Sequence, residues 1–311
     1  MTAYLLRRLV HMVPVLFLMT LFVFFLVRFV PGDPATAMLG DRATPDRVAR
    51  LNTALKLDRP YYVQYAAFLR NLAKGDLGES IRRREPVRGI VIDRMQPTLF
   101  LAFYAMLLSV LIAVPLATVA ALKKGGLADQ AVRGYLVLSI GMPTYWIGMM
   151  LLQFLAVKHR VFPVSGWGEG FFGHLDSLFL PALALALAVS SLMIRSLRNS
   201  ILETLETDYV RTARAKGLGQ SRIMIWHVMR NSALSTITIL GINFAFLVGG
   251  ATITETIFAI PGLGQLIVGS IFNQDYPVIQ GVTLAIGVLV LLISLLTDIC
   301  YALLDPRVSF E

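Results

Sequence analysis

A short basic segment lies between two long hydrophobic stretches of the chain. It reads Thr207-Asp208-Tyr209-Val210-Arg211-Thr212-Ala213-Arg214-Ala215-Lys216-Gly217-Leu218. The segment predicts a short helix, because Thr207 or Asp208 can cap its first turn and Gly217 can take the left-handed conformation that closes its last turn. Lys216 suits the negative C-terminal end of such a helix. Since the segment offers the helix no core of its own, we expect it to dock against another molecule.

One face of this predicted helix carries two small residues and a tyrosine. Tyr209, Ala213 and Gly217 follow one another at four-residue spacing and therefore share a face. Small residues on that face would allow a second backbone to come close. Arg211 and Arg214 project beside it, so the expected docking surface is both narrow and basic.

The composition indicates an integral membrane protein. Hydrophobic residues make up 56% of the 311 residues and charged residues only 15%, a balance outside the range of soluble proteins. Six apolar stretches are long enough to cross a bilayer as helices, for which roughly 20 residues suffice. We place the spans at Leu9–Val30, Thr98–Leu122, Gly134–Val157, Leu178–Ile194, Ala233–Ile257 and Gln280–Leu304. The expected fold is an all-α membrane protein with six transmembrane helices.

The distribution of basic residues predicts the orientation of these spans. The net charge is +9, but we expect it to reflect topology rather than nucleic-acid binding. Thirteen Lys and Arg residues fall on the side that holds the N-terminus, whereas the short loops of the other side hold only Lys158 and Arg160. Short cytoplasmic loops carry the excess of Lys and Arg. We therefore expect both termini and the segment Thr207–Leu218 in the cytoplasm.

The chain divides into four parts by this reading. The parts are an amphipathic start with the first span (1–30), an extracytoplasmic segment (31–97), a transmembrane core (98–304) and a short cytoplasmic tail (305–311). Within the second part, Asp46–Lys56 and Tyr61–Ala73 show apolar residues at helical spacing. After the fifth span, the apolar residues and glycines of Ile260–Leu266 predict a loop folded back on the bundle.

Catalytic motifs are missing from the sequence. No Gly-x-x-x-x-Gly-Lys-Ser/Thr phosphate loop is present, no His/Cys/Asp cluster has metal-binding spacing, and no Gly-x-Ser-x-Gly nucleophile motif occurs. We therefore expect the chain to catalyse nothing by itself and to hold neither metal nor cofactor.

Two polar residues within the fifth span are candidates for a translocation path or gate. Asn243 lies some ten residues into the span, and it can either line a path or bond a neighbouring helix. Glu255 lies near the outer end of the same span, where an acid either pairs structurally or acts in gating.

The segment Tyr209–Leu218 resembles the cytoplasmic coupling motif, known as the EAA loop, of binding-protein-dependent ATP-binding-cassette (ABC) importer permeases. Within that family the chain is similar to the first permease of the dipeptide, oligopeptide and nickel importers. The matching motifs, in chain order, are Tyr4–Leu9, Pro31–Pro34, Leu57–Pro60, Tyr62–Tyr65, Gly75–Gly78, Leu180–Leu183, Glu255–Phe258, Pro261–Leu266 and Asp305–Arg307. The motif's leading Glu is replaced by Arg211 and its first Ala by Thr212, so no salt bridge of that Glu is carried over.

The resemblance implies a type I ABC importer permease with an extracytoplasmic insertion after the first helix. It implies a complex in the bacterial inner membrane, with a second related permease, two cytoplasmic ATPases and an extracytoplasmic binding protein, and without nucleic acid. The ATPases would bind ATP and Mg, which accounts for the missing phosphate loop. The segment 208–222 would contact an ATPase through Tyr209, Arg211, Ala213, Arg214, Ala215, Lys216 and Gly217.

The resemblance identifies the type of transporter more narrowly than it identifies the transported solute. Peptides are the first expectation, and nickel chelates, haem and glutathione-like solutes use similar permeases. Two other classes stay open: a stand-alone channel or secondary transporter, which would predict repeats or deep paired charges, and a scaffold whose basic loop binds acidic lipids or proteins.

Overall fold

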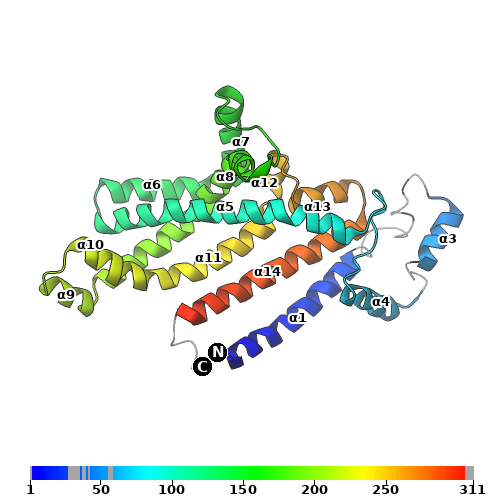
Figure 1. The fold of residues 1–311 in the computed structure, drawn as a ribbon, viewed down its shortest axis with the longest axis horizontal. Coiled ribbons are helices and arrows are strands. Elements are labelled where there is room, and N and C mark those ends of the chain that lie inside the picture. The colour runs from blue at the N-terminus through cyan, green and yellow to red at the C-terminus, as the bar shows by residue number, and fades with distance from the viewer. Residues whose placement is uncertain (1, 27–35, 37–39, 41–42, 55–58, 305–311) are drawn as a thin grey trace. The chain divides into compact units, whose positions relative to one another are not determined.

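A computed structural model describes residues 2–26, 36, 40, 43–54 and 59–304 of the chain. Helices dominate these residues, and a single isolated β-bridge joins Glu79 to Pro86 (Figure 1). The helices are α1 (Thr2–Leu26), α3 (Pro45–Ala54), α4 (Tyr61–Ala73), α5 (Val87–Leu122), α6 (Leu127–Gly141), α7 (Thr144–Leu151), η2 (Leu152–Lys158), α8 (Gly170–Leu205), α9 (Asp208–Ala215), α10 (Gln220–Arg222), η3 (Ile223–Met229), α11 (Arg230–Gly250), α12 (Thr252–Ile257), α13 (Leu263–Phe272) and α14 (Tyr276–Leu304).

The chain forms two compact units. Within the described residues, the first unit contains 99–260 and 292–304, and the second contains 2–98 and 261–291. Four helices are long and apolar enough to cross a membrane, and six spans result if each of two bent helix pairs counts as one. This agrees with the expected six-helix membrane protein.

The core of the first unit is built from small and branched side chains. Four alanines of α5, at positions 113, 117, 120 and 121, are buried against Met193, Ile194, Leu197 and Ile201 of α8. Alanine at these positions lets helices pack closely, as is common between membrane helices. Polar bonds add to this packing: the hydroxyls of Tyr135 and Ser139 in α6 donate to the carbonyl of Leu187 in α8, at 2.8 and 2.7 Å.

The third predicted span, Gly134–Val157, is broken rather than straight. Helix α6 ends at Gly141, Met142 is extended (φ −98°, ψ 125°), and the next helix axis turns by 102° (Figure 1). The residue before a proline is disfavoured in helical conformation, and Pro143 follows Met142 directly. Pro181, by contrast, lies within the 36-residue helix α8, which continues past it. Proline alone therefore did not predict the break.

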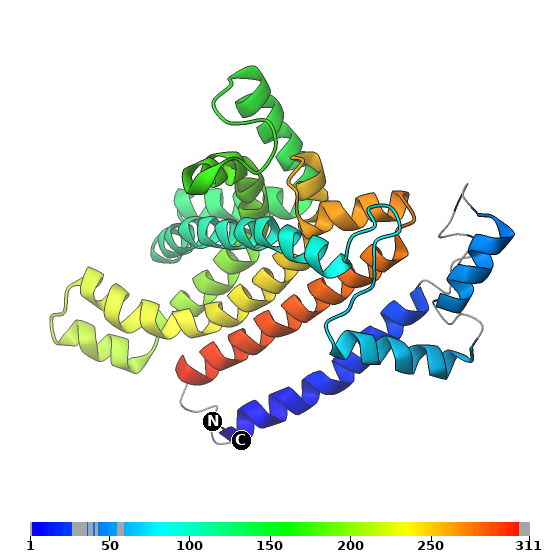
Figure 2. The same cartoon turned by 45° about the vertical axis from the view of Figure 1, so that its right-hand side comes forward.

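The second unit contains α1, α3, α4, α13 and the N-terminal parts of α5 and α14. Tyr65 and Phe68 of α4 pack against Phe24 of α1, with ring centroids 5.2 and 5.9 Å away (Figure 2). A second cluster buries Val87 and Val91 of α5 with apolar side chains of α13 and α14. Gly281 of α14 is required there, since an added Cβ would lie 2.5 Å from the Val87 side chain.

The sequence predicted the small helices of this unit well. Tyr61–Ala73 is helix α4 with the predicted bounds, and the predicted Asp46–Lys56 is helix α3, Pro45–Ala54. The loop expected after Ile260 contains a helix instead, because Leu263 and Leu266 of α13 lie one turn apart and both enter the buried cluster. The motifs Pro31–Pro34 and Asp305–Arg307, with Leu57 and Asp58, lie outside the described residues.

Candidate functional site

The segment between α8 and α11 is a helical hairpin within the first unit, and α9 is its first arm (Figure 1). Thr207 precedes α9 with an extended backbone (φ −72°, ψ 152°), which is the predicted capping position. Its side chain makes no capping bond, because the hydroxyl donates to the Thr204 carbonyl at 2.6 Å. The position of the helix start was therefore predicted correctly, and the side-chain cap was not.

The C-terminal end of α9 is closed by Gly217, as expected. Its φ is +76°, in the left-handed region. The Gly217 amide donates to Arg214 O at 2.9 Å, and the Leu218 amide donates to Ala213 O at 3.2 Å. These two bonds form a Schellman motif, which favours glycine because a side chain is strained at this φ.

One side of α9 is buried in the core of its own unit. Val210 is fully buried and Ala213 is 6% exposed, and both join a cluster with Ile223 and Val228 of η3 and Ile201 of α8. The expectation that the helix lacks a core was wrong, because η3 folds back against α9. Ala213 therefore packs inside this chain, so it does not lie on an open docking face.

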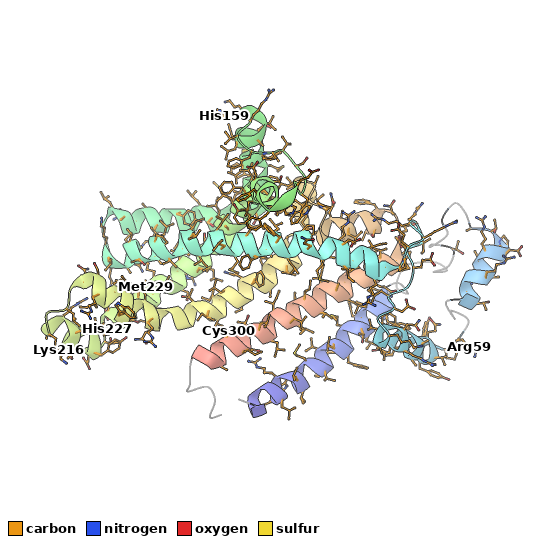
Figure 3. The ribbon with its side chains drawn as sticks, in the orientation of Figure 1. Arg59, His159, Lys216, His227, Met229 and Cys300 are labelled. Carbon is orange, nitrogen blue, oxygen red and sulfur yellow. The ribbon has the colours of Figure 1, made fainter. Side chains whose placement is uncertain are left out.

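The other side of α9 is exposed and basic. Arg211, Arg214, Ala215 and Lys216 are all exposed, and Figure 3 shows Lys216 at the same end of the unit as His227. Arg211 lies 3.5 Å from Asp208, and both side chains are largely in solvent, where such pairs contribute little. This face can contact a complementary acidic or polar surface.

Tyr209 lies at the edge of the exposed face. Its side chain is 43% exposed, and its hydroxyl accepts a bond of 2.7 Å from Asn231 Nδ2 at the start of α11. Asn231 also donates to the carbonyl of His227. The tyrosine thus links α9 to the helix that leads away from the hairpin.

A buried ionic cluster that the sequence patterns did not predict ties the start of α6 to α8. Asp129 is fully buried, and Arg198 binds it with two bonds, Nε to Oδ1 at 2.8 Å and Nη2 to Oδ2 at 2.9 Å. Arg133 Nη2 and the Gly125 amide each donate to Oδ2 at 3.0 Å. We call these four residues the Asp129 cluster. The sequence does contain a hint of a special role for Asp129, since it is the only acidic residue in positions 94–168.

The Asp129 cluster bears on the hairpin because Arg198 lies two turns before the end of α8. Helix α8 continues to Leu205, and α9 begins three residues later. Two-point pairing of a guanidinium with a carboxylate fixes direction as well as distance. The cluster therefore fixes α8 against the start of α6.

The two predicted path residues lie apart from the hairpin in sequence and differ in setting. Asn243 of α11 is 5% exposed, and its Nδ2 lies 3.4 Å from the Val189 carbonyl of α8. Glu255 of α12 is fully buried. Among the described residues, no group of three or more His, Cys, Asp and Glu side chains could hold a metal ion.

Comparisons with protein families match nearly the whole chain. Residues 113–310 match the family described as "Binding-protein-dependent transport system inner membrane component". Residues 1–102 match its N-terminal counterpart, "Binding-prot-dependent transport system membrane comp, N-term".

Curated relatives match over their full length. The chain is 36% identical over 338 residues to "Dipeptide transport system permease protein DppB" of Escherichia coli (strain K12), covering all of both chains. It is also 36% identical, over 313 residues and all of both chains, to "Probable peptide ABC transporter permease protein y4tP" of Sinorhizobium fredii.

Solved structures show the same fold at low sequence identity. An inward-facing form of the MetNI methionine ABC transporter aligns with a TM-score of 0.59 and 17% identity, over 70% of this chain and 96% of that one. An amino acid ABC transporter aligns with a TM-score of 0.53 and 16% identity, over 70% and 94%. The fold is therefore that of type I ABC importer permeases.

Proposed function

The chain belongs to the inner membrane components of binding-protein-dependent transport systems, and we propose that it carries peptides across the membrane by coupling to an ATPase through α9. Its full-length similarity to permeases named for peptide and dipeptide transport supports the permease role and the peptide cargo. One structural observation supports the coupling role: α9 is held rigidly on one side and presents a basic face on the other.

The proposed complex contains this chain, a second related permease, two cytoplasmic ABC ATPases and an extracytoplasmic binding protein. ATP and Mg would be bound by the ATPase chains, since this sequence has no phosphate loop. The chain is a multi-pass protein of the inner membrane, and the bias of Lys and Arg supports cytoplasmic termini.

The proposed coupling is mechanical. Closure of the ATPase pair on ATP would move α9, whose Schellman motif and buried side prevent it from deforming separately. Helix α8 and the Asp129 cluster would carry this movement to α6, and η3 would carry it to α11. ATP drives such a change because it binds the two conformations with different affinity.

The experiment compares two neighbouring glycines of the hairpin. Gly217 has φ +76°, whereas Gly219 has φ −64°, and an added Cβ at either position meets nothing within 4 Å. In the reconstituted complex, Gly217→Val should abolish substrate-stimulated ATPase activity while the subunits still assemble. Gly219→Val, the matched control, should retain most of the stimulation because valine fits an ordinary φ. Unaffected stimulation in Gly217→Val would falsify the coupling role.

A further inference from the structure

The connection between α4 and α5 is a pinned basic loop that the proposed transport mechanism does not use. Glu79 and Pro86 form a bridge, the Ser80 amide donates to Glu85 O at 2.9 Å, and the Arg84 amide donates to Ser80 O at 2.9 Å. Arg84 has φ +57°, which is uncommon for a side chain other than glycine. Three consecutive arginines, 82 to 84, occupy this tight loop.

Asp275, between α13 and α14, holds the loop in place. Asp275 is 4% exposed, and its carboxylate accepts a bond from the Ser80 hydroxyl at 2.5 Å. The amides of Ile81 and Arg82 donate to it at 3.2 and 3.4 Å. The acid is therefore bonded by neutral donors of the loop. These bonds hold the loop backbone in position.

A pocket of about 250 Å³ lies beside the pinned loop. Three arginines, Arg82, Arg83 and Arg94, line it together with residues of α13 and with Val278 of α14. Asn273 and the pinning acid Asp275, from the connection between these helices, also line it, so the lining carries three basic groups and one acidic group. Arg82 Nε donates to the Asn273 carbonyl at 3.0 Å, which fixes the direction of that side chain. This bond places the Arg82 guanidinium at the wall of the pocket, beside the side chains of Arg83 and Arg94.

Arg83 and Arg94 bring an excess of positive charge to this pocket. The charge of Arg83 acts unfavourably on Arg94, and the charge of Asp93 offsets this only in part. No ion pair within 4.0 Å joins either of them to a carboxylate in the described part of the chain. Two neighbouring guanidinium groups favour an oxyanion between them, and the guanidinium fork matches phosphate oxygens in two-point contacts.

The pocket lies next to the predicted starts of two membrane spans. Arg94 precedes the span at Thr98 by four residues, about 6 Å along a helix at 1.5 Å per residue. Val278, which lines the pocket with Leu266, precedes the span at Gln280 by two residues. The pocket lining thus combines apolar side chains with basic groups, close in sequence to the predicted starts of two spans.

We propose that this pocket binds a phosphate oxyanion, supplied by the headgroup of an anionic phospholipid. The arginines bind the phosphate, while Leu266 and Val278 contact the apolar part of the lipid. Free phosphate shares the chemistry of the headgroup, but the position beside two span starts favours the lipid. The bound lipid would hold the loop of residues 79–86 against α13, independently of the coupling role of α9.

The test measures lipid binding to the purified complex. The complex is stripped of lipid in mild detergent, and short-chain phosphatidylglycerol or phosphatidylcholine is added. We expect phosphatidylglycerol to raise the midpoint of thermal unfolding more than phosphatidylcholine does, and native mass spectrometry to detect the retained lipid. In the double variant Arg83→Gln, Arg94→Gln, the apparent affinity for phosphatidylglycerol should fall at least about tenfold, or about 1.4 kcal/mol.

The control removes the same charge elsewhere in the unit. Arg70→Gln with Arg88→Gln changes two residues that do not line the pocket and should leave the lipid preference intact. If the pocket double variant fails to assemble, the single variants should each weaken the preference partly.

Equal losses of lipid affinity in the control and pocket variants overturn the site. Protection by inorganic phosphate alone, without a preference for phosphatidylglycerol, overturns the lipid source. The lipid source is also overturned if the pocket double variant keeps a normal lipid preference but docks the external binding protein more weakly. That result would make the pocket a protein interface.

Discussion

Two buried aspartates hold loops in place in the two units, and they do so with different chemistry. Asp129 is bonded by Arg198, Arg133 and one backbone amide. Asp275 is bonded by the Ser80 hydroxyl and two backbone amides. In the first case a cation of the chain neutralises the acid. In the second case neutral donors bond the acid, and no ion pair within 4.0 Å joins it to an arginine in the described residues.

The comparison explains why the two sites suit different roles. A buried carboxylate and guanidinium pair ties two helices in one geometry, here α6 and α8, and α8 leads directly into the hairpin. A loop held by neutral donors positions its own side chains for something else. We therefore assign the Asp129 cluster to force transmission and the Asp275 loop to ligand binding.

The largest predicted effect follows from removing the charge of Asp129. Asp129→Asn leaves Arg198, which is 13% exposed, without its buried counter-charge, and breaking a buried pair on one side costs roughly 3–5 kcal/mol. The thermal midpoint of the purified complex should fall strongly. Asp208→Asn is the control, because the Asp208–Arg211 pair is exposed and contributes at most about 1 kcal/mol. Equal midpoints for the two variants would remove the distinction between buried and exposed pairs.

A smaller effect is expected at Asp275. Asp275→Asn keeps one acceptor oxygen but turns an amide donor toward donors of the loop, and an unsatisfied buried group costs roughly 1–3 kcal/mol. The loss should be local, so we expect faster tryptic cleavage at Arg82–Arg84 with little change in the thermal midpoint. Asp76→Asn, which alters the single 2.9 Å bond from the Gly78 amide, should not change the cleavage rate. A global loss of stability without faster cleavage would contradict the local role.

The smallest net effect is expected when both members of the ionic pair become neutral. Replacing a buried ion pair by neutral groups of similar shape is often close to neutral in stability. The double variant Asp129→Asn, Arg198→Gln should therefore be more stable than Asp129→Asn alone, as thermal midpoints would show. A further loss in the double variant would mean that Arg198 stabilises α8 without Asp129.

Sequence patterns predicted the elements better than their contacts. Helical spacing predicted the bounds of α4, and the preference of helix ends for glycine predicted the left-handed conformation of Gly217. The break at Met142 was missed because Pro143 and Pro181 look alike in a hydrophobic stretch, although only the first follows an extended residue.

The burial of Ala213 was missed because it depends on η3, which folds back from 10 or more residues further along. Asp129 and Arg198 are 69 residues apart, so no local pattern pairs them.

The central claim is that the exposed face of α9 contacts the ATPase. Cross-linking tests it most directly, with Cys300→Ser as the background because Cys300 is the single cysteine of the chain (Figure 3). A photo-activated probe on Ala215→Cys, at an exposed position of α9, should form an adduct with the ATPase subunit. The same probe on Val164→Cys, at an exposed loop position expected on the outer side, should form none. Absence of an ATPase adduct at position 215, or an equal yield at position 164, would contradict the account.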